Sequence, residues 1–408
     1  MYENLVLQPA GRQLASDIRR GIFPGAVLFS GPDASGKLTA ALETARILDC
    51  ASGGGEWQCS CPSCRRNRSL TSTGMLLCGP RDCFLEIAAA ADTFLRAVRN
   101  DERYVAAARY LFLRSVRKLT LRFSGILWQG DDRLSKIGAA VSALDELLET
   151  LDFPRQLPEF TGLEKMCLEI KEKARKLEED FLYDSVPVMQ IRNMESWAQI
   201  KPEHGRKTVI IENADRMQTG VRNALLKILE EPPAGCVFIL LTSRRNSVMP
   251  TILSRVRTYN FSGRDADGQR QVISRVFHNE EFSGGISDYL LTFLPVPPLK
   301  LRAASAEFFA GIAAGKLPDA AAVSSECGKF EPRVELRIFL DALVSSLRPY
   351  FRSPAGCEAA ADVMAAVRAC WDNVSVYNQS PAAALETLVR SISRTNALNG
   401  NIFRCEDM

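Results

Sequence analysis

The spacing of apolar positions near the start of the chain predicts an alternation of helix and strand. Apolar residues recur at helical intervals over about residues 10–20. Residues 26–29 are continuously apolar, as in a strand that is buried on both faces of a parallel sheet. A glycine-containing loop and a helical pattern over about residues 37–48 follow. This order of strand, glycine loop and helix is typical of a nucleotide-binding unit.

The same α/β pattern returns after residue 186. Residues 208–211 and 237–241 are apolar and rich in β-branched side chains, which predicts two further buried strands, with a helix over residues 220–230 between them. From about residue 265 onward the pattern is helical. We therefore expect an α/β core, with a parallel sheet and flanking helices, followed by all-α regions.

A long helical stretch over about residues 84–181 interrupts the α/β pattern. Pro154 and Pro158 divide it, which predicts antiparallel helices joined by a proline elbow. Lysine and glutamate alternate in its last part, whereas its first part carries a run of cations: Arg96, Arg99, Arg103, Arg109, Arg114, Arg117, Lys118 and Arg122. These cations suggest a basic face, although the simpler interpretation is a solvated helical surface.

Composition narrows the class of protein. With 408 residues, of which 46% are hydrophobic and 24% charged, the chain is long enough for two or three globular domains. A net charge of +3 is too balanced for a protein whose whole surface follows nucleic acid. We expect neither a membrane span nor a signal peptide, since no apolar run is long enough and the first residues are polar. The cytoplasm is the expected location, where cysteines stay reduced or bind metal.

The glycine loop has the spacing of a phosphate-binding loop. Gly31 and Gly36 would let backbone N–H groups surround an anion, and Lys37 would reach the phosphates. The Mg²⁺-binding Ser or Thr that should follow the lysine is replaced by Leu38. Thr39 comes one position late, which turns its hydroxyl by about 100° around the helix. We expect weak or absent binding of ATP or ADP with Mg²⁺; the alternative is an ordinary glycine turn.

Four cysteines are crowded into fifteen residues: Cys50, Cys59, Cys61 and Cys64. Four soft ligands at this spacing suit a closed tetrahedral site for structural Zn²⁺. A catalytic metal is not expected, because four thiolates leave no open position for a substrate. Reduced thiols in a loop are the alternative.

Two further positions bear on catalysis. Glu212 ends a predicted strand and could hold Mg²⁺ through water, but Asn213 follows it where an acid would activate the attacking water, and an amide cannot accept that proton. Thr242 ends the next strand and completes this degenerate nucleotide-binding set. Ser254 and Arg255 follow, and an arginine presented at a helix end can stabilise phosphate charge in a neighbouring subunit. Taken alone, Arg255 would be read as a surface arginine.

Together these segments resemble the bacterial clamp-loader subunits, the AAA+ proteins of DNA polymerase III. The resemblance is carried by residues 4–8 and 21–32, the cysteine cluster, residues 209–217, 223–233 and 250–255, and more weakly residues 379–388. Two departures are visible: one gap between cysteines is a single residue, and Val256 replaces the cysteine of a Ser-Arg-Cys motif.

The resemblance implies three domains. An AAA+ domain would span residues 1–262, with a zinc module at 50–64 and a helical insertion at about 84–185. A helical lid would span 263–300, and a helical collar for oligomerisation 301–408. The insertion has no counterpart in the family pattern.

The resemblance also implies a role. Degenerate positions at Leu38 and Asn213 beside an intact Ser254 and Arg255 look like the delta-prime stator, which gives its arginine finger to a neighbour. Its partners would be gamma/tau and delta subunits, with the sliding clamp and primed DNA reached through the complex during replication. Two alternatives stay open: an active gamma/tau-like ATPase in which Thr39 takes the metal, and a zinc-containing DNA-binding adaptor that uses the inserted helices.

Overall fold

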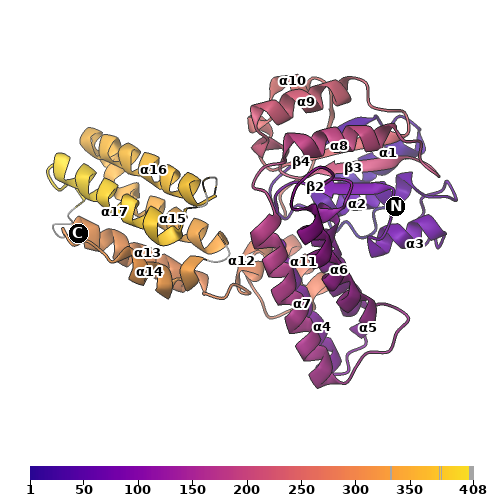
Figure 1. Ribbon diagram of the computed structural model, residues 1–408, viewed down its shortest axis with the longest axis horizontal. Helices are drawn as coiled ribbons and strands as arrows, with labels where there is room; N and C mark the ends of the chain where they lie inside the picture. The colour runs from indigo at the N-terminus through magenta and orange to yellow at the C-terminus, as the bar shows by residue number, and fades with distance from the viewer. Residues whose placement is uncertain (331–332, 376, 378, 404–408) are drawn as a thin grey trace. The chain divides into compact units, whose positions relative to one another are not determined.

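The computed structural model describes residues 1–330, 333–375, 377 and 379–403 (Figure 1). The chain forms two compact units, Met1–Tyr289 and Leu290–Met408. The first contains a sheet and the second is helical. This division does not test the three domains expected from the sequence, which stay a prediction.

The first unit is built on a parallel sheet of five strands in the order β2-β3-β4-β1-β5. The strands are β1 (Ala26–Ser30), β2 (Met75–Cys78), β3 (Lys207–Ile211), β4 (Cys236–Thr242) and β5 (Arg257–Asn260). The three central strands were predicted, whereas the two edge strands were not. The apolar run of β2 is only four residues long and has no β-branched residue, and β5 is polar and partly exposed, so neither gave a clear strand signal.

Helices cover both faces of this sheet. Those outside the insertion are α1 (Ala10–Arg19), α2 (Lys37–Leu48), α3 (Pro62–Ser69), α8 (Val188–Gln199), α9 (Thr219–Glu230), α10 (Pro250–Leu253) and α11 (Ala266–Phe277), with 3₁₀ turns η2 (Ala214–Arg216) and η3 (Arg245–Ser247). In β4, Val237 and Ile239 pack with α1 and α2, while Phe238 and Leu240 pack with α8 and α9. This layered arrangement fits the α/β core that the resemblance implied.

The insertion consists of four helices, α4 (Phe84–Arg99), α5 (Val105–Thr120), α6 (Leu134–Thr150) and α7 (Phe160–Phe181), with a 3₁₀ turn η1 (Leu121–Phe123). Helices α6 and α7 form a hairpin joined by residues 151–159, as the two prolines predicted (Figure 1). The side chains Phe94, Phe112 and Ile170 share one continuous core with the sheet. The Glu178 carboxylate on α7 accepts backbone N–H groups at the start of α4, which fixes the two helices against each other.

The cations of the insertion point mostly inward rather than forming a basic face. Arg109 donates to the carbonyl of Leu151 over 2.6 Å, and Arg117 pairs with Asp152 over 2.5 Å. Others bond to groups of the core: Arg114 to the carbonyl of Arg68, Lys118 to Glu86, and Arg122 to Glu212. Because these arginine and lysine side chains are paired inside the protein, they are not exposed as a nucleic-acid-binding surface would require.

The second unit packs α13 (Pro298–Ala313), α14 (Ala320–Glu326), α15 (Val334–Ser346), α16 (Pro354–Ser375) and α17 (Pro381–Leu398), with 3₁₀ turns η4 (Gly328–Phe330) and η5 (Arg348–Arg352). Helix α12 (Ile286–Leu291) spans the boundary between the units. The core includes Phe308, Phe339 and Leu388. Across the described residues of both units, no helix combines the length and the apolar character that crossing a membrane requires.

Candidate functional site

The phosphate-like loop connects β1 to the first turn of α2, as the sequence predicted. Gly36 has a φ of 93°, a left-handed conformation that favours glycine. A side chain at Gly31 would place its Cβ 2.2 Å from the carbonyl oxygen of Phe261. Lys37 folds back over the loop, and its Nζ donates to the carbonyls of Gly31 and Pro32 over 2.6 Å each. Burial lowers the pKa of Lys37, because the ammonium loses water.

The two residues after this lysine differ in their surroundings. Leu38 is buried in the core between the sheet and α2, so it packs where a metal-binding hydroxyl was expected. Thr39 is half-buried. An unpredicted residue, Arg264, also meets the loop: its guanidinium donates to the carbonyl of Ala34 and, over 3.1 Å, to that of Val6. The sequence marks Arg264 in no way except its position just after β5.

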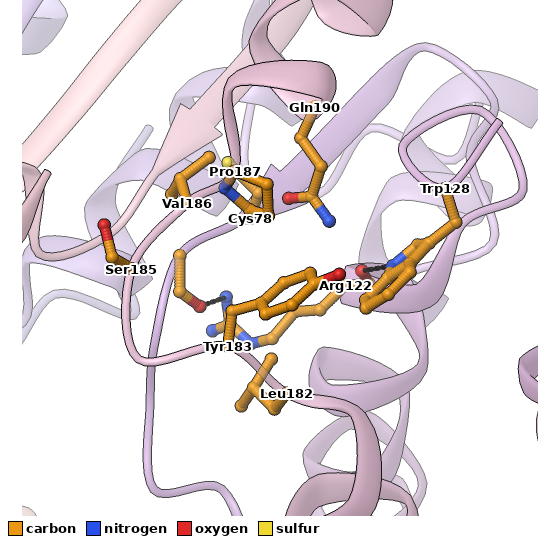
Figure 2. Close-up of a pocket in the computed structure, with 10 residues that line it drawn as sticks. Cys78, Arg122, Trp128, Leu182, Tyr183, Ser185, Val186, Pro187 and Gln190 are labelled. Carbon is orange, nitrogen blue, oxygen red and sulfur yellow. Dashed lines mark hydrogen bonds between the residues drawn. The ribbon is translucent and has the colours of Figure 1, made fainter. Parts of the chain in front are cut away.

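Glu212, at the carboxyl end of β3, is buried and has both oxygens occupied. Its Oε1 accepts Arg81 Nη1 at 2.9 Å, and its Oε2 accepts Arg122 Nη2. Burial alone would raise the pKa of Glu212, but the two arginines outweigh it and lower the pKa. Arg122 also donates to the carbonyl of Gly79 over 3.3 Å (Figure 2). Neither arginine was predicted as a site residue.

Asn213 stands at the position where an acidic residue would act as the general base, and here it has a structural role. It has a φ of 51°, and its Nδ2 donates to the carbonyl of Pro80 over 2.6 Å. This bond joins the loop after β3 to the loop after β2. At the next strand, Thr242 Oγ1 donates to Asp215 Oδ1 over 2.6 Å and accepts the backbone N–H of Arg244. Thr242 therefore organises the loops at the carboxyl edge of the sheet.

These contacts do not fit a bound Mg²⁺–nucleotide. Mg²⁺ needs free oxygen ligands, and the oxygens of Glu212 are held by guanidinium groups. The Lys37 ammonium binds carbonyls of its own loop. The residues predicted for the nucleotide therefore meet at one edge of the sheet, but their polar groups are used by the protein itself.

Arg255 lies at the end of α10 and is turned toward a different helix. Its Nε donates to Glu230 Oε1 on α9 over 2.9 Å, and its Nη1 donates to the carbonyl of Thr251 over 2.7 Å. The side chains of Arg255 and Glu230 are 31% and 51% exposed. Ser254 is exposed beside it and donates to the same carbonyl of Thr251 over 3.0 Å. An exposed ion pair of this kind is worth about 0–1 kcal/mol, so Arg255 is available for another partner.

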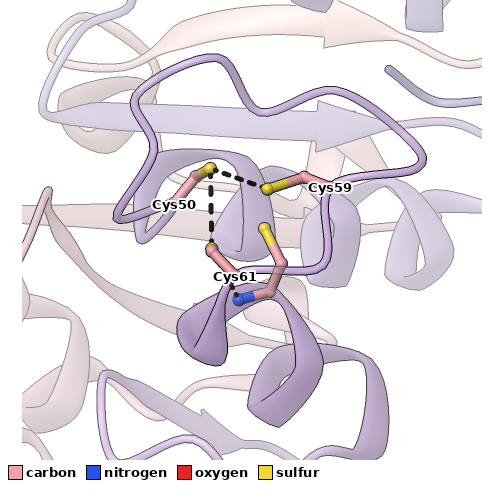
Figure 3. Close-up of side chains that lie close together, drawn as sticks. Cys50, Cys59 and Cys61 are labelled. Atoms are coloured by element: carbon pink, nitrogen blue, oxygen red, sulfur yellow. Dashed lines mark hydrogen bonds between the residues drawn. The ribbon is translucent and has the colours of Figure 1, made fainter.

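The four predicted cysteines converge between α2 and α3. Their sulfur atoms all lie within 4.8 Å of one another, and Cys50 Sγ is 3.7 Å from Cys59 Sγ and 4.0 Å from Cys61 Sγ (Figure 3). A tetrahedral site with Zn–S bonds of about 2.3 Å has sulfur separations of about 3.8 Å. The donor set therefore fits a closed tetrahedral metal ion, which would supply structural cross-linking between the loop and the helices when bound.

Hydrogen bonds from neighbouring groups favour metal binding by these thiols. The sulfur of Cys61 caps α3 by accepting the backbone N–H of Cys64 over 3.4 Å. Desolvation acts to raise the pKa of Cys61, but hydrogen bonds from Cys64 and its neighbours lower it to about 6, which favours the thiolate that binds metal. The buried Arg46 of α2 donates to Cys64 Sγ over 3.0 Å, and this partner of the cluster was not predicted.

The comparisons with known proteins agree with the resemblance drawn from the sequence. Residues 161–265 match the family described as "DNA polymerase III, delta subunit". This segment contains Glu212, Asn213, Thr242 and Arg255 but not the phosphate-like loop or the cysteines.

Three curated relatives illustrate the similarity. The chain is 37% identical over 78 residues to the DNA polymerase III subunit delta' of Haemophilus influenzae, covering 19% of this chain and 24% of that protein. It is 38% identical over 71 residues to the delta' subunit of Pseudomonas aeruginosa, covering 17% and 22%. It is 44% identical over 55 residues to the tau subunit of Bacillus subtilis, covering 14% and 10%. The matched segments thus span less than a quarter of the length of each relative. On this evidence a segment of the chain is similar to clamp-loader subunits of DNA polymerase III, and the delta-prime subunits are among the proteins that it resembles.

Proposed function

We propose that this chain is a delta-prime-like stator that does not hydrolyse ATP and that lends Arg255 to the nucleotide site of a neighbouring subunit. The observation that carries the proposal is the contrast between two sites. Glu212 is buried between two arginines and Asn213 cannot act as a base, whereas Arg255 is exposed in a weak ion pair. The Glu212 carboxylate that hydrolysis would require is thus held in ion pairs within the chain, while the Arg255 guanidinium that would act in trans is accessible.

In this role the chain works as part of a hetero-oligomer. Gamma/tau and delta subunits are the partners, and the complex acts on the sliding clamp and primed DNA in the cytoplasm. The cysteine cluster binds structural Zn²⁺, which the sulfur separations support. We assign to residues 301–408, within the helical second unit, the oligomerisation collar that the family resemblance implies.

The second candidate, an active gamma/tau-like ATPase, is favoured by the match to a tau subunit and by the intact Lys37. It requires Thr39 to take the metal and Glu212 to leave its arginines. The third candidate, a DNA-binding adaptor, loses support because the cations that suggested it are mostly in internal contacts.

The experiment is reconstitution of the complex with the Arg255→Ala variant. An arginine finger is worth about 10³–10⁵ in turnover in GTPases, so the neighbouring site should lose nearly all of its activity. Steady-state ATP hydrolysis of the assembled complex measures this loss, and Arg245→Ala, which removes an exposed arginine of η3, serves as the control. An unchanged rate with Arg255→Ala, or motor-like turnover by the purified chain alone, would contradict the stator role.

A further inference from the structure

The inserted block reaches into the degenerate nucleotide site through one residue, Arg122. This arginine lies in η1, directly after α5, and its side chain is 1% exposed. Its guanidinium contacts the Glu212 carboxylate and the carbonyl of Gly79, which are groups that follow β3 and β2. A residue of the insertion therefore holds the carboxylate that was predicted to hold Mg²⁺.

Other residues of the insertion hold the backbone of Arg122 in place. The carbonyl of Arg122 accepts the indole N–H of Trp128 over 2.8 Å (Figure 2). The Trp128 ring stacks against Phe123 and Tyr183, with ring centroids 5.5 and 5.1 Å away. The Arg133 guanidinium carbon lies 4.8 Å from the centroid of the Tyr183 ring and adds a cation–π contact to this cluster. Because these rings come from the middle and from the end of the insertion, the position of Arg122 depends on the block being folded.

The charges around Glu212 form an alternating chain. Arg122 binds Glu212, Glu212 binds Arg81, Arg81 binds Glu86 over 2.9 Å, and Glu86 binds Lys118 of α5. Three cations thus meet two anions, and two of the cations come from the insertion. A divalent cation placed at Glu212 would add charge to a site that already has a surplus of positive charge, in surroundings where water screens it little.

We propose that Arg122 is a permanent internal cation in the position of the metal, so that the inserted block itself keeps Mg²⁺–nucleotide out of the site. The proposal rests on the proposed function, because it gives the physical cause of the missing hydrolysis. A small pocket beside Arg122, lined by Tyr183, Ser185 and Gln190, would extend to Glu212 once the guanidinium is removed (Figure 2). Water and a hydrated cation could then reach the freed Oε2.

The test measures ADP binding to the full chain by calorimetry, in Mg²⁺ and in EDTA. For the natural chain we expect the two affinities to agree within twofold. For Arg122→Met we expect Mg²⁺ to strengthen ADP binding at least tenfold, because one oxygen of Glu212 is released while Arg81 still holds the other. Arg117→Met is the matched control, since Arg117 is a buried cation of the preceding helix α5 that binds Asp152 instead. Its Mg²⁺ dependence should equal that of the natural chain.

A second variant keeps the proposal testable if Arg122→Met does not fold. Arg122→Gln removes the charge but keeps a polar side chain, and we expect Mg²⁺ to strengthen its ADP binding at least tenfold as well. If the natural chain already binds ADP more than twofold tighter in Mg²⁺, or if the folded Arg122 variants stay within twofold of the natural chain, the proposal is overturned. Either result would leave the Arg255 experiment untouched, so the two proposals fail separately.

Discussion

Arg46 offers the sharpest test of how the cysteine cluster is held, because it uses every donor that an arginine has. Its five N–H groups reach the two oxygens of Glu43 at 2.9 and 2.7 Å, the carbonyls of Gly55 and Glu56 at 2.9 and 3.1 Å, and Cys64 Sγ at 3.0 Å. The side chains of Arg46 and Glu43 are 2% and 4% exposed. Arg46 thus joins α2, the return loop before Cys59, and one thiol.

The change is Arg46→Lys, which keeps the charge and removes the planar fork. Lysine has three donors, so at least two of the five buried contacts stay unmade. Each buried group left without a partner costs about 1–3 kcal/mol, which gives a loss of about 2–6 kcal/mol in the free energy of unfolding. A typical domain has about 5–15 kcal/mol in total, so the loss is a large share. Removing a partner that orients a metal ligand also lowers metal affinity by about 10–100-fold.

Urea unfolding measures the stability, and competition with a chromophoric chelator measures the Zn²⁺ affinity. The control is Arg65→Lys, an exposed arginine of the same module, for which we expect a change within about 0.5 kcal/mol. If Arg46→Lys unfolds at the same urea concentration as the natural chain and binds Zn²⁺ equally well, the five-contact argument is wrong.

Three further predictions concern the core and the inserted block. Glu86 has its pKa lowered from 4.5 to about 2, since its bonds to Lys118 and Arg81 outweigh its desolvation; the stability it contributes, about 3 kcal/mol, should therefore be complete above pH 4.5 and be lost as the pH falls toward 2. Acid titration of the melting temperature tests this, and Glu86→Gln should flatten the curve in that range. Gly79→Ala should abolish soluble expression or lower the melting temperature strongly, because Gly79 has a φ of 103° and its added Cβ would lie 2.3 Å from the carbonyl oxygen of Glu212; Gly53→Ala, a left-handed glycine with open space, is the control in the same thermal assay. Phe94→Ala should cost about 3–5 kcal/mol in urea unfolding, because the fully buried ring stacks with Phe112 inside the core of the insertion, and a cost below 1 kcal/mol would contradict this packing.

The sequence was sufficient for the parts of the fold that have a regular pattern. Continuous apolar runs identified β1, β3 and β4, and the glycine spacing placed Lys37 at the start of α2. The cysteine spacing likewise brought four thiols together. In each case the signal is local, since one stretch of chain contains all the residues that make it.

The remaining features depend on contacts between distant segments. Arg122 meets Glu212 only because the insertion folds against the edge of the sheet, and nothing in its neighbours along the chain distinguishes it from the cations of the preceding α5. The same holds for Arg46 and Arg264, which bond to backbone carbonyls that any sequence provides. The edge strand β5 was missed for a different reason. It is partly exposed, so its sequence lacks the apolar run by which the central strands were predicted.

The place of the insertion in the chain has a consequence for the order in which the protein folds. Strands β2 and β3 are neighbours in the sheet, yet residues 79–206 separate them in sequence. Closing so long a flexible loop costs conformational entropy, and each doubling of loop length adds about 0.6 kcal/mol. Gly79, just before the insertion, and Ser185, at its end, line one small pocket with Cys78, so a block that folds first from its local helical contacts brings β2 and β3 together. The inserted helices would then act during synthesis as a folding nucleus, and truncation within them should slow sheet formation as well as lower stability.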